Sequence, residues 1–318
     1  MYNEALKSEF MQETTDNISV ARSYSKLFSA TEPYEEKWGA DLCTRNADEL
    51  QIMVNEMLGT RASSIRVRLI WLKTYVKWCI DNGVPGACDG MLQIRNAGVD
   101  RIREQMVSSP FHLQIYLDSV FDPESEQTTD NIYRCFFWLA YGGMEEEEIF
   151  EVKASEIDFE NMVVRHNNLN YPIYRESIRA FKNCAYLTEF NYKNPAYVNK
   201  ESVPRDRVPG DTLIRGIRNI PTPKSFKVTL SRKSKAGIES GATTIKLSYQ
   251  RAWLSGLFYR MSEMERAGLP VDFTDAAKRF TASKEYKLDS GRNLIGAKVR
   301  YISKGYAEDY QRWKLAYS

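Results

Sequence analysis

The stretch that most constrains the fold is residues 136–158, FFWLAYGGMEEEEIFEVKASEID. Its apolar first part is typical of a buried helix, and the pair Gly142-Gly143 marks a turn, since glycine tolerates backbone conformations that other residues avoid. The amphipathic part that follows is typical of a second helix, and Ser155 to Asp158 leads into a strand. The stretch therefore predicts a helix, a turn, a second helix and the start of a small sheet.

The four consecutive glutamates at 145–148 are candidates for chemistry. Consecutive residues on a helix point in different directions, so they make a poor metal site. Carboxylates are instead favoured at a helix N-terminus by the helix dipole. No metal site is predicted, and the sequence contains no P-loop, no GxGxxG, no HExxH and no plausible Ser-His-Asp order.

Short apolar runs follow this stretch. Residues 157–159, 162–165 and 169–174 are separated by Glu-Asn and Asn-Asn turns, which predicts a three-strand meander. His166, at the second turn, is expected to be an exposed polar residue rather than a base. The predicted fold class is therefore mostly α, with a small three-stranded antiparallel sheet.

The N-terminal part reads as a helical domain over residues 17–83, and its clearest helix is 63–83. Ser63 or Ser64 is expected to cap this helix and Gly83 to end it. Apolar residues at steps of three and four give it one buried face. A basic stripe accompanies that face: Arg61, Arg66, Lys73 and Lys77.

Two domains are predicted, residues 1–105 and 110–318, with a connection over 84–109 where Pro85 and two glycines break regular structure. Residues 231–237, SRKSKAG, are predicted to be a concentrated basic loop. The helices predicted for the second domain are 111–121, 131–143 capped by Asp130, 176–190, about 244–267, and further helical structure over 273–316.

Composition restricts the class of protein. Of 318 residues, 43% are hydrophobic and 27% charged, which is typical of a soluble globular chain. No apolar stretch reaches the roughly 18–20 residues that span a bilayer, and MYNEALKSEF is not a signal peptide, so we expect a cytoplasmic location. The five cysteines are widely spaced without a C-x-x-C pair, which predicts reduced thiols.

The charge is unevenly distributed. The chain carries a net charge of only +2, yet residues 161–318 hold 29 basic and 14 acidic side chains, a net charge of +15. Such an excess suggests a polyanionic partner, because neutralised phosphates release condensed counterions. The alternative is a solvated basic surface without a partner.

Residues 136–158 resemble the T-G-L-R-I-S-E-L-L-x-L-x-W-x-D-I-D segment of tyrosine recombinases, the phage integrase family. The resemblance extends over about residues 17–310. It implies a helical, SAM-like core-binding domain that clamps DNA, followed by a catalytic-type domain. In that family two arginines, a lysine and two histidine-type residues surround a phosphate, and a tyrosine attacks it.

This chain departs from the family at almost every one of these positions. The first arginine falls on Glu145, while the structural glutamate after it is retained as Glu148. No lysine occurs in the expected hairpin at 165–171, although Lys278 and Arg279 could supply a cation if the alignment shifts. The remaining degenerate positions are Thr274 and Ala297 for the histidines, Ala277 for the second arginine, and Tyr306 or Tyr310 for the nucleophile.

The resemblance therefore implies a DNA-binding protein without enzymatic activity or a cofactor. Its layout is similar in particular to the master repressors of lysogeny in SPβ-type Bacillus phages, which implies binding to repeated double-stranded DNA operators and silencing of lytic genes. Two alternatives remain open: a divergent but active recombinase, and an accessory protein that binds an active integrase. The C-terminal helix is a candidate for pairing with another copy.

In this interpretation basic residues of both domains contact phosphates from opposite sides of the duplex. The N-terminal set is the basic stripe above. Gln250 and Arg251, at the start of a predicted helix, are the candidates for reading bases. The second set of candidate DNA contacts is Arg232, Lys233, Lys235, Lys278, Arg279, Lys298 and Arg300.

Overall fold

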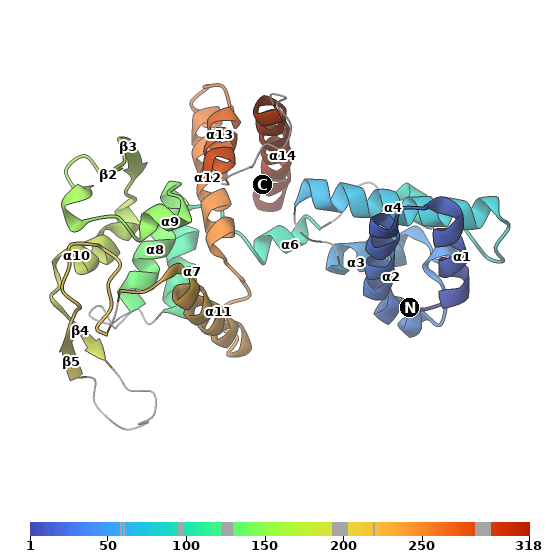
Figure 1. Ribbon diagram of the computed structural model, residues 1–318, viewed down its shortest axis with the longest axis horizontal. Helices are drawn as coiled ribbons and strands as arrows, with labels where there is room; N and C mark the ends of the chain where they lie inside the picture. The colour runs from blue at the N-terminus through green and yellow to red at the C-terminus, as the bar shows by residue number, and fades with distance from the viewer. Residues whose placement is uncertain are drawn as a thin grey trace. The chain divides into compact units, whose positions relative to one another are not determined.

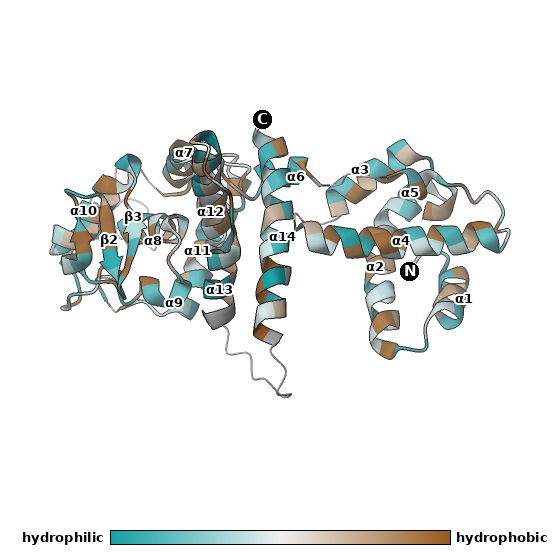
Figure 2. Ribbon diagram, turned by 90° about the horizontal axis from the view of Figure 1, so that it is seen from above, coloured by the Kyte–Doolittle hydropathy of each residue, from teal (hydrophilic) through white to brown (hydrophobic). Residues whose placement is uncertain are grey.

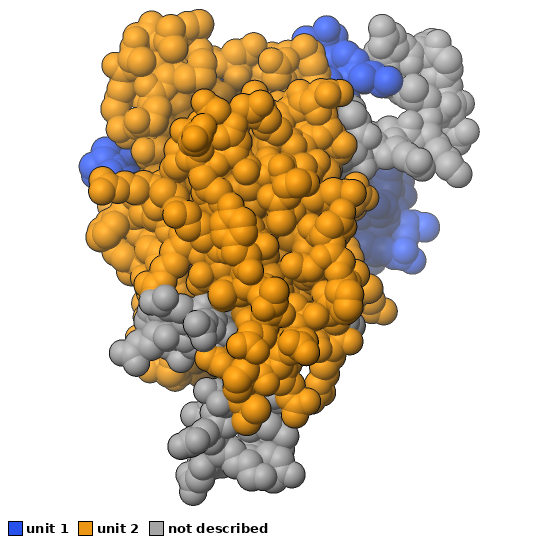
Figure 3. All heavy atoms as spheres, turned by 90° about the vertical axis from the view of Figure 1, so that its left-hand side faces the viewer, with its two compact units in different colours: residues 1–102, 290–318 blue, residues 103–289 orange. Residues whose placement is uncertain are grey.

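The computed structural model describes residues 1–57, 59, 61–94, 98–121, 130–192, 203–218, 220–283 and 294–318. The chain divides into two compact units, each with its own hydrophobic core. Unit 1 comprises Met1–Ile102 with Ser290–Ser318, and unit 2 comprises Arg103–Asp289 (Figure 3). The chain is mostly helical with a small three-stranded antiparallel sheet, which confirms the predicted fold class.

Unit 1 is entirely helical in the residues described (Figure 1). Its longest N-terminal helix is capped by Asn17, whose side chain accepts the backbone N–H of Ser19 at 2.9 Å, and it ends at Gly39, which has a left-handed φ of 63°. The elements are α1 (Glu4–Thr14), α2 (Ile18–Trp38), the 3₁₀ turn η1 (Leu42–Thr44), α3 (Ala47–Met57), α4 (Ala62–Asp81), α5 (Gly90–Gln93), α6 (Asp100–Arg103) at the boundary, and α14 (Leu294–Tyr317).

Aromatic rings and one buried ion pair hold α1, α2 and α4 together. The ring of Phe10 packs edge-on against Tyr24 at 5.1 Å and Tyr75 at 5.2 Å. Beside them, Lys7 Nζ lies 2.5 Å from Glu35 Oε2, and neither side chain is exposed to solvent. Glu35 also accepts hydrogen bonds from the Thr31 hydroxyl and the Leu42 backbone amide, so the buried carboxylate has two donors besides its countercharge.

The start of α4 differs from the prediction. The helix begins at Ala62 after Arg61, one residue before the serines expected to cap it, and Arg61 makes no side-chain cap. The oxygen that caps the helix comes instead from α14, where Asp309 Oδ1 accepts the Ala62 N–H at 2.6 Å. A contact distant in sequence therefore replaces the local cap. The expected end is confirmed, since Gly83 follows the helix with a φ of 66°.

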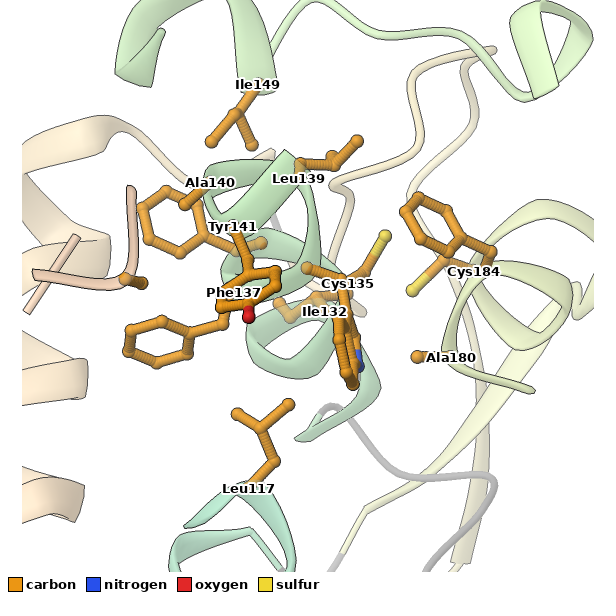
Figure 4. Packing of buried hydrophobic residues seen from close by; sticks show 14 of the residues in the cluster. Leu117, Ile132, Cys135, Phe137, Leu139, Ala140, Tyr141, Ile149, Ala180 and Cys184 are labelled. Atoms are coloured by element: carbon orange, nitrogen blue, oxygen red, sulfur yellow. The ribbon is translucent and has the colours of Figure 1, made fainter. Parts of the chain in front are cut away.

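Unit 2 is built around α8, in which every residue from Arg134 to Gly142 is buried. Figure 4 shows its side chains Ile132, Phe137 and Tyr141 meeting residues of neighbouring elements. The helices are α7 (Pro110–Val120), α8 (Asp130–Gly142), α9 (Glu146–Ile149), α10 (Ile178–Tyr186), α11 (Pro223–Glu239), α12 (Tyr249–Arg266) and α13 (Thr274–Ser283), with 3₁₀ turns η2 (Ala154–Glu156) and η3 (Arg175–Ser177).

The predicted meander is present as β1 (Ile157–Asp158), β2 (Val163–His166) and β3 (Leu169–Pro172), paired in the order β1-β2-β3. Asn167 and Asn168 form the β2–β3 turn with φ of 49° and 60°, a conformation that asparagine tolerates. A second sheet of β4 (Glu189–Tyr192) and β5 (Val203–Asp206) was not predicted. The predicted helix 176–190 therefore ends earlier, at Tyr186.

Two further predictions for unit 2 were wrong. Residues 231–237 are not a loop but part of α11, because Thr222 caps a helix that starts at Pro223 and buries Phe226 and Gly237. His166 is not exposed: it is 5% accessible, and its Nδ1 lies 3.0 Å from Glu156 Oε2.

The two compact units also divide the chain differently from the expected boundary. Unit 1 ends at Ile102, close to the expected residue 105, but α14 groups with unit 1 rather than with the C-terminal domain. Ion pairs from Asp309 and Glu308 to α4 explain why. Figure 2 shows hydrophilic and hydrophobic residues alternating along α14 and α4, as expected for helices with one covered face.

Candidate nucleic-acid interface

Glu145, at the position where the resemblance places a phosphate-binding arginine, is the N-cap of α9. Glu148 completes a capping box, in which its Oε2 accepts the Glu145 N–H at 3.2 Å. The Tyr171 hydroxyl donates to the same Oε2 at 3.0 Å, and Lys227 Nζ lies 2.8 Å from Glu146. The glutamates therefore start a helical turn and tie it to β3 and α11.

The carboxyl group of Glu145 is electrostatically strained. Burial and the neighbouring charges of Glu148 and Glu147 raise its pKa to about 7, while the charge of Arg279 opposes this increase. Glu145 Oε1 is buried, and none of the described residues gives it a hydrogen bond. At this position the structure therefore presents a carboxyl group and not a cation.

The other degenerate positions of unit 2 lie on α13. Thr274 begins the helix, and its N–H and hydroxyl both bond Asp272 Oδ1, at 2.9 and 2.7 Å. Ala277 is fully buried. Lys278 pairs with an aspartate of its own helix at 3.1 Å, whereas Arg279 is exposed and close enough to influence the α9 glutamates. The expected β2–β3 hairpin lysine is absent from the sequence.

Both tyrosines considered for the nucleophile lie on α14, in unit 1. Tyr306 is 2% exposed, and the Arg61 guanidinium lies 5.8 Å from its ring centre. Tyr310 is 1% exposed and stacks on Trp313 at 6.1 Å. Ala297 is exposed and offers no polar side chain. Both candidate tyrosines are therefore buried in the structure.

The N-terminal basic stripe is largely engaged within the unit. Arg61 Nε lies 2.8 Å from Asp309 Oδ2, and Arg66 pairs with Glu308. These four side chains join the first turn of α4 to α14.

The other two residues of the stripe, Lys73 and Lys77, bind groups on α4 or at the end of α5. Lys73 Nζ donates to the Ile94 carbonyl at 2.6 Å and so covers the end of α5. Lys77 pairs with Asp81 one turn along α4 at 3.0 Å, although it is exposed. An exposed ion pair of this kind contributes little to stability, so Lys77 can readily exchange the aspartate for a phosphate.

Among the candidate cations on α11, Arg232 and Lys235 are three residues apart and share one side of the helix, whereas Lys233 points to another side. Arg232 is exposed, Lys233 pairs with Asp130 at 2.8 Å, and Lys235 pairs with a glutamate of its own helix.

Gln250 is exposed in the first turn of α12, as predicted, and Arg251 beside it is half-buried. Lys298 and Arg300 belong to α14 and therefore to unit 1, where they are half-buried and exposed respectively.

A crevice between α2 and α4 brings together cations that the sequence interpretation missed. It has a volume of about 220 Å³. Lys26 and Arg68 are exposed, and neither makes an ion pair or hydrogen bond with the residues that the structure describes. The half-buried indole of Trp71 and the hydroxyl of Ser23 complete a lining that is cationic, aromatic and hydroxylic. The full lining is Ser23, Lys26, Leu27, Ala30, Arg68 and Trp71.

Comparisons with known proteins bear on the same region. Residues 1–81 match the protein family described as MrpR, N-terminal core-binding domain. Among solved structures, the chain is similar to an integrase from mycobacterium phage Brujita, with 13% identity over 98% of this chain and 91% of that chain. The TM-score of 0.30 is too low for this similarity to assign a function. A comparison with curated proteins gave no match.

The family match thus covers α1 to α4, including both walls of the crevice. The sequence could have indicated the α2 wall of the crevice. Its residues follow each other at helical steps of three, one and three, which places them on one side of α2: Ser23, Lys26, Leu27 and Ala30.

Two classes of site have no support in the part of the chain that the structure describes. No group of three or more His, Cys, Asp or Glu side chains there is placed to hold a metal ion. No described helix is both long and apolar enough to cross a membrane.

Proposed function

We propose that the chain is a sequence-specific DNA-binding protein on a recombinase-type scaffold that has lost strand-exchange chemistry. In this proposal it acts as a transcriptional repressor of the kind that maintains phage lysogeny, and its partner is a repeated double-stranded operator. The observation that carries the proposal is the α2–α4 crevice, where Lys26 and Arg68 lie beside Trp71 and no residue that the structure describes neutralises their charge.

The chemistry of this crevice matches a DNA backbone. Cations without an intramolecular partner gain most from a phosphate, because no existing ion pair has to break first. The match of residues 1–81 to a core-binding domain supports the same surface. The net charge of +15 over residues 161–318 supports a second contribution from the C-terminal half.

The proposed loss of catalysis rests on Glu145. A carboxyl group replaces a cation where charge develops during phosphoryl transfer, and no rearrangement of a glutamate side chain can supply positive charge. The burial of Tyr306 and Tyr310 supports the same conclusion, since a nucleophile has to reach the phosphorus atom.

Binding and cleavage can be tested separately on one DNA. Duplexes enriched by repeated selection on the intact protein are labelled, and affinity is measured by fluorescence anisotropy at several salt concentrations beside a scrambled duplex. We expect tight, salt-dependent binding to the selected sequence. The same sequence carrying a nick should give no covalent protein–DNA adduct on a denaturing gel; an adduct lost on Tyr306→Phe would instead establish an active recombinase.

A further inference from the structure

The first turn of α4 already holds two anionic groups. Asp309 Oδ1 accepts the Ala62 N–H at 2.6 Å, and its Oδ2 lies 2.8 Å from Arg61 Nε. Glu308, the preceding residue of α14, pairs with Arg66 one turn further along α4. The adjacent carboxylates of Asp309 and Glu308 on α14 therefore bind the Ala62 amide and the guanidinium groups at the start of α4.

These groups on α4 are also those that bind phosphate in proteins. A helix N-terminus offers unpaired N–H groups and the positive end of the helix dipole, and arginine matches the geometry of both carboxylate and phosphate oxygens. The side chain of Asp309 is 7% exposed and that of Glu308 27%, so the first of them is nearly withdrawn from solvent. A phosphate and these carboxylates cannot occupy the same donors at once.

We propose that α14 is an autoinhibitory element, in which Asp309 and Glu308 occupy the phosphate-binding groups of α4. This inference rests on the proposed DNA-binding function. DNA engages the crevice first through Lys26 and Arg68, which pair with no carboxylate in the described part of the chain. It gains Arg61 and Arg66 only when α14 leaves the first turn of α4. The affinity of the protein for DNA therefore depends on how firmly α14 is held.

The contact can be followed in the unaltered protein by hydrogen exchange with and without the selected duplex. Amides of α14 around Asp309 should exchange faster when DNA is bound, while the first turn of α4 stays protected. Unchanged or slower exchange in α14, together with protection of the α2–α4 crevice, would overturn the autoinhibition but leave DNA binding intact. Absence of any protection by DNA would instead reject the proposed function itself.

A charge-removing variant gives an independent readout. Glu308→Gln removes one blocking charge at a partly exposed position, and we expect it to tighten binding to the selected duplex about fivefold. The matched control is Glu49→Gln, which removes a glutamate paired with Arg45 at 3.7 Å on α3 and should change affinity less than twofold. Equal affinities for the two variants would contradict the proposal, and thermal unfolding of both verifies that they remain folded.

Discussion

Gly256 lies directly against the backbone of Tyr141: a Cβ added to Gly256 would stand 1.8 Å from the Tyr141 carbonyl oxygen. Arg260, one turn further along α12, donates to the same oxygen at 2.5 Å. This close crossing fixes α12 against α8. The end of α8 leads to Glu145, and α12 begins beside Gln250, so the contact positions both parts of the candidate interface in unit 2.

Gly256→Ala should therefore destabilise unit 2 strongly. The new methyl group has no space unless the two helices separate, and overpacking of this severity costs about 3 kcal/mol or more in the free energy of unfolding. The measurement is urea unfolding followed by circular dichroism. Gly305→Ala is the matched control: a Cβ there meets nothing within 4 Å, and alanine favours the helix by about 1 kcal/mol. Similar effects of both substitutions would refute the close crossing.

Lys7→Met should destabilise unit 1 by about 3 kcal/mol, because it leaves the Glu35 carboxylate buried without its countercharge. Burial already raises the pKa of Glu35, and Lys7 holds it down. The double variant Lys7→Met/Glu35→Gln should recover part of the loss, since it removes the uncompensated charge. Free energies of unfolding are measured for the wild type, both single variants and the double variant. If the losses of the two single variants simply add in the double variant, the two side chains do not interact.

Glu145→Gln should change how stability depends on pH. Burial raises the pKa of Glu145 from its ordinary 4.5 to about 7. The contribution of this group to the free energy of unfolding is therefore complete below about pH 4.5 and is lost as the pH rises through 7. Because the group is half-buried and screened, we expect a decline of only about 2 kcal/mol. The amide that replaces the carboxyl group cannot ionise, so the variant should gain stability relative to the wild type between about pH 5 and pH 8.

Unfolding curves recorded at both pH values check this prediction. Glu151→Gln, at an exposed position just after α9, serves as the control and should keep the wild-type profile. Parallel profiles for wild type and Glu145→Gln would mean that the Glu145 carboxyl group titrates normally in the folded protein.

Arg68→Ala and Lys26→Ala should each weaken binding to the selected duplex and to random DNA by a similar factor of about 5–10, because they remove phosphate contacts rather than base contacts. The slope of log affinity against log salt should decrease by about one unit for each. Lys37→Ala, on the same helix as Lys26 but three turns away, should leave both quantities near wild type. Salt titrations by fluorescence anisotropy give all of these values, and unaltered slopes would remove the crevice from the interface.

Local patterns predicted most of the elements. The glycine turn after α8 and the meander depend on neighbouring residues, so periodicity and turn chemistry were sufficient to find them. The start of α12 was predicted too early, at about residue 244, whereas the helix begins at Tyr249 after the Ser248 cap. The helical nature of residues 231–237 was missed because glycine and serine weaken the signal there, whereas Phe226 and Gly237, both buried, show that packing decides it.

The candidate interface was harder to predict because it depends on contacts distant in sequence. Arg61 and Arg66 have the spacing of a basic stripe, but only the position of α14 shows that Asp309 and Glu308 neutralise them. Lys26 and Arg68 are distant in sequence and meet only when α2 packs on α4. The substitution at Glu145 could be identified from the resemblance alone, whereas its raised pKa follows from burial and required the structure.

The central claim is specific DNA binding without strand exchange, and its most direct test is to recover chromatin bound by the intact protein in its host and search the enriched DNA for a common sequence. Our interpretation predicts discrete peaks that share a repeated motif and lie in promoters. Enrichment at a single junction where two DNA segments have been joined would contradict it and favour an active recombinase. Uniform recovery without a shared motif would contradict sequence-specific binding altogether.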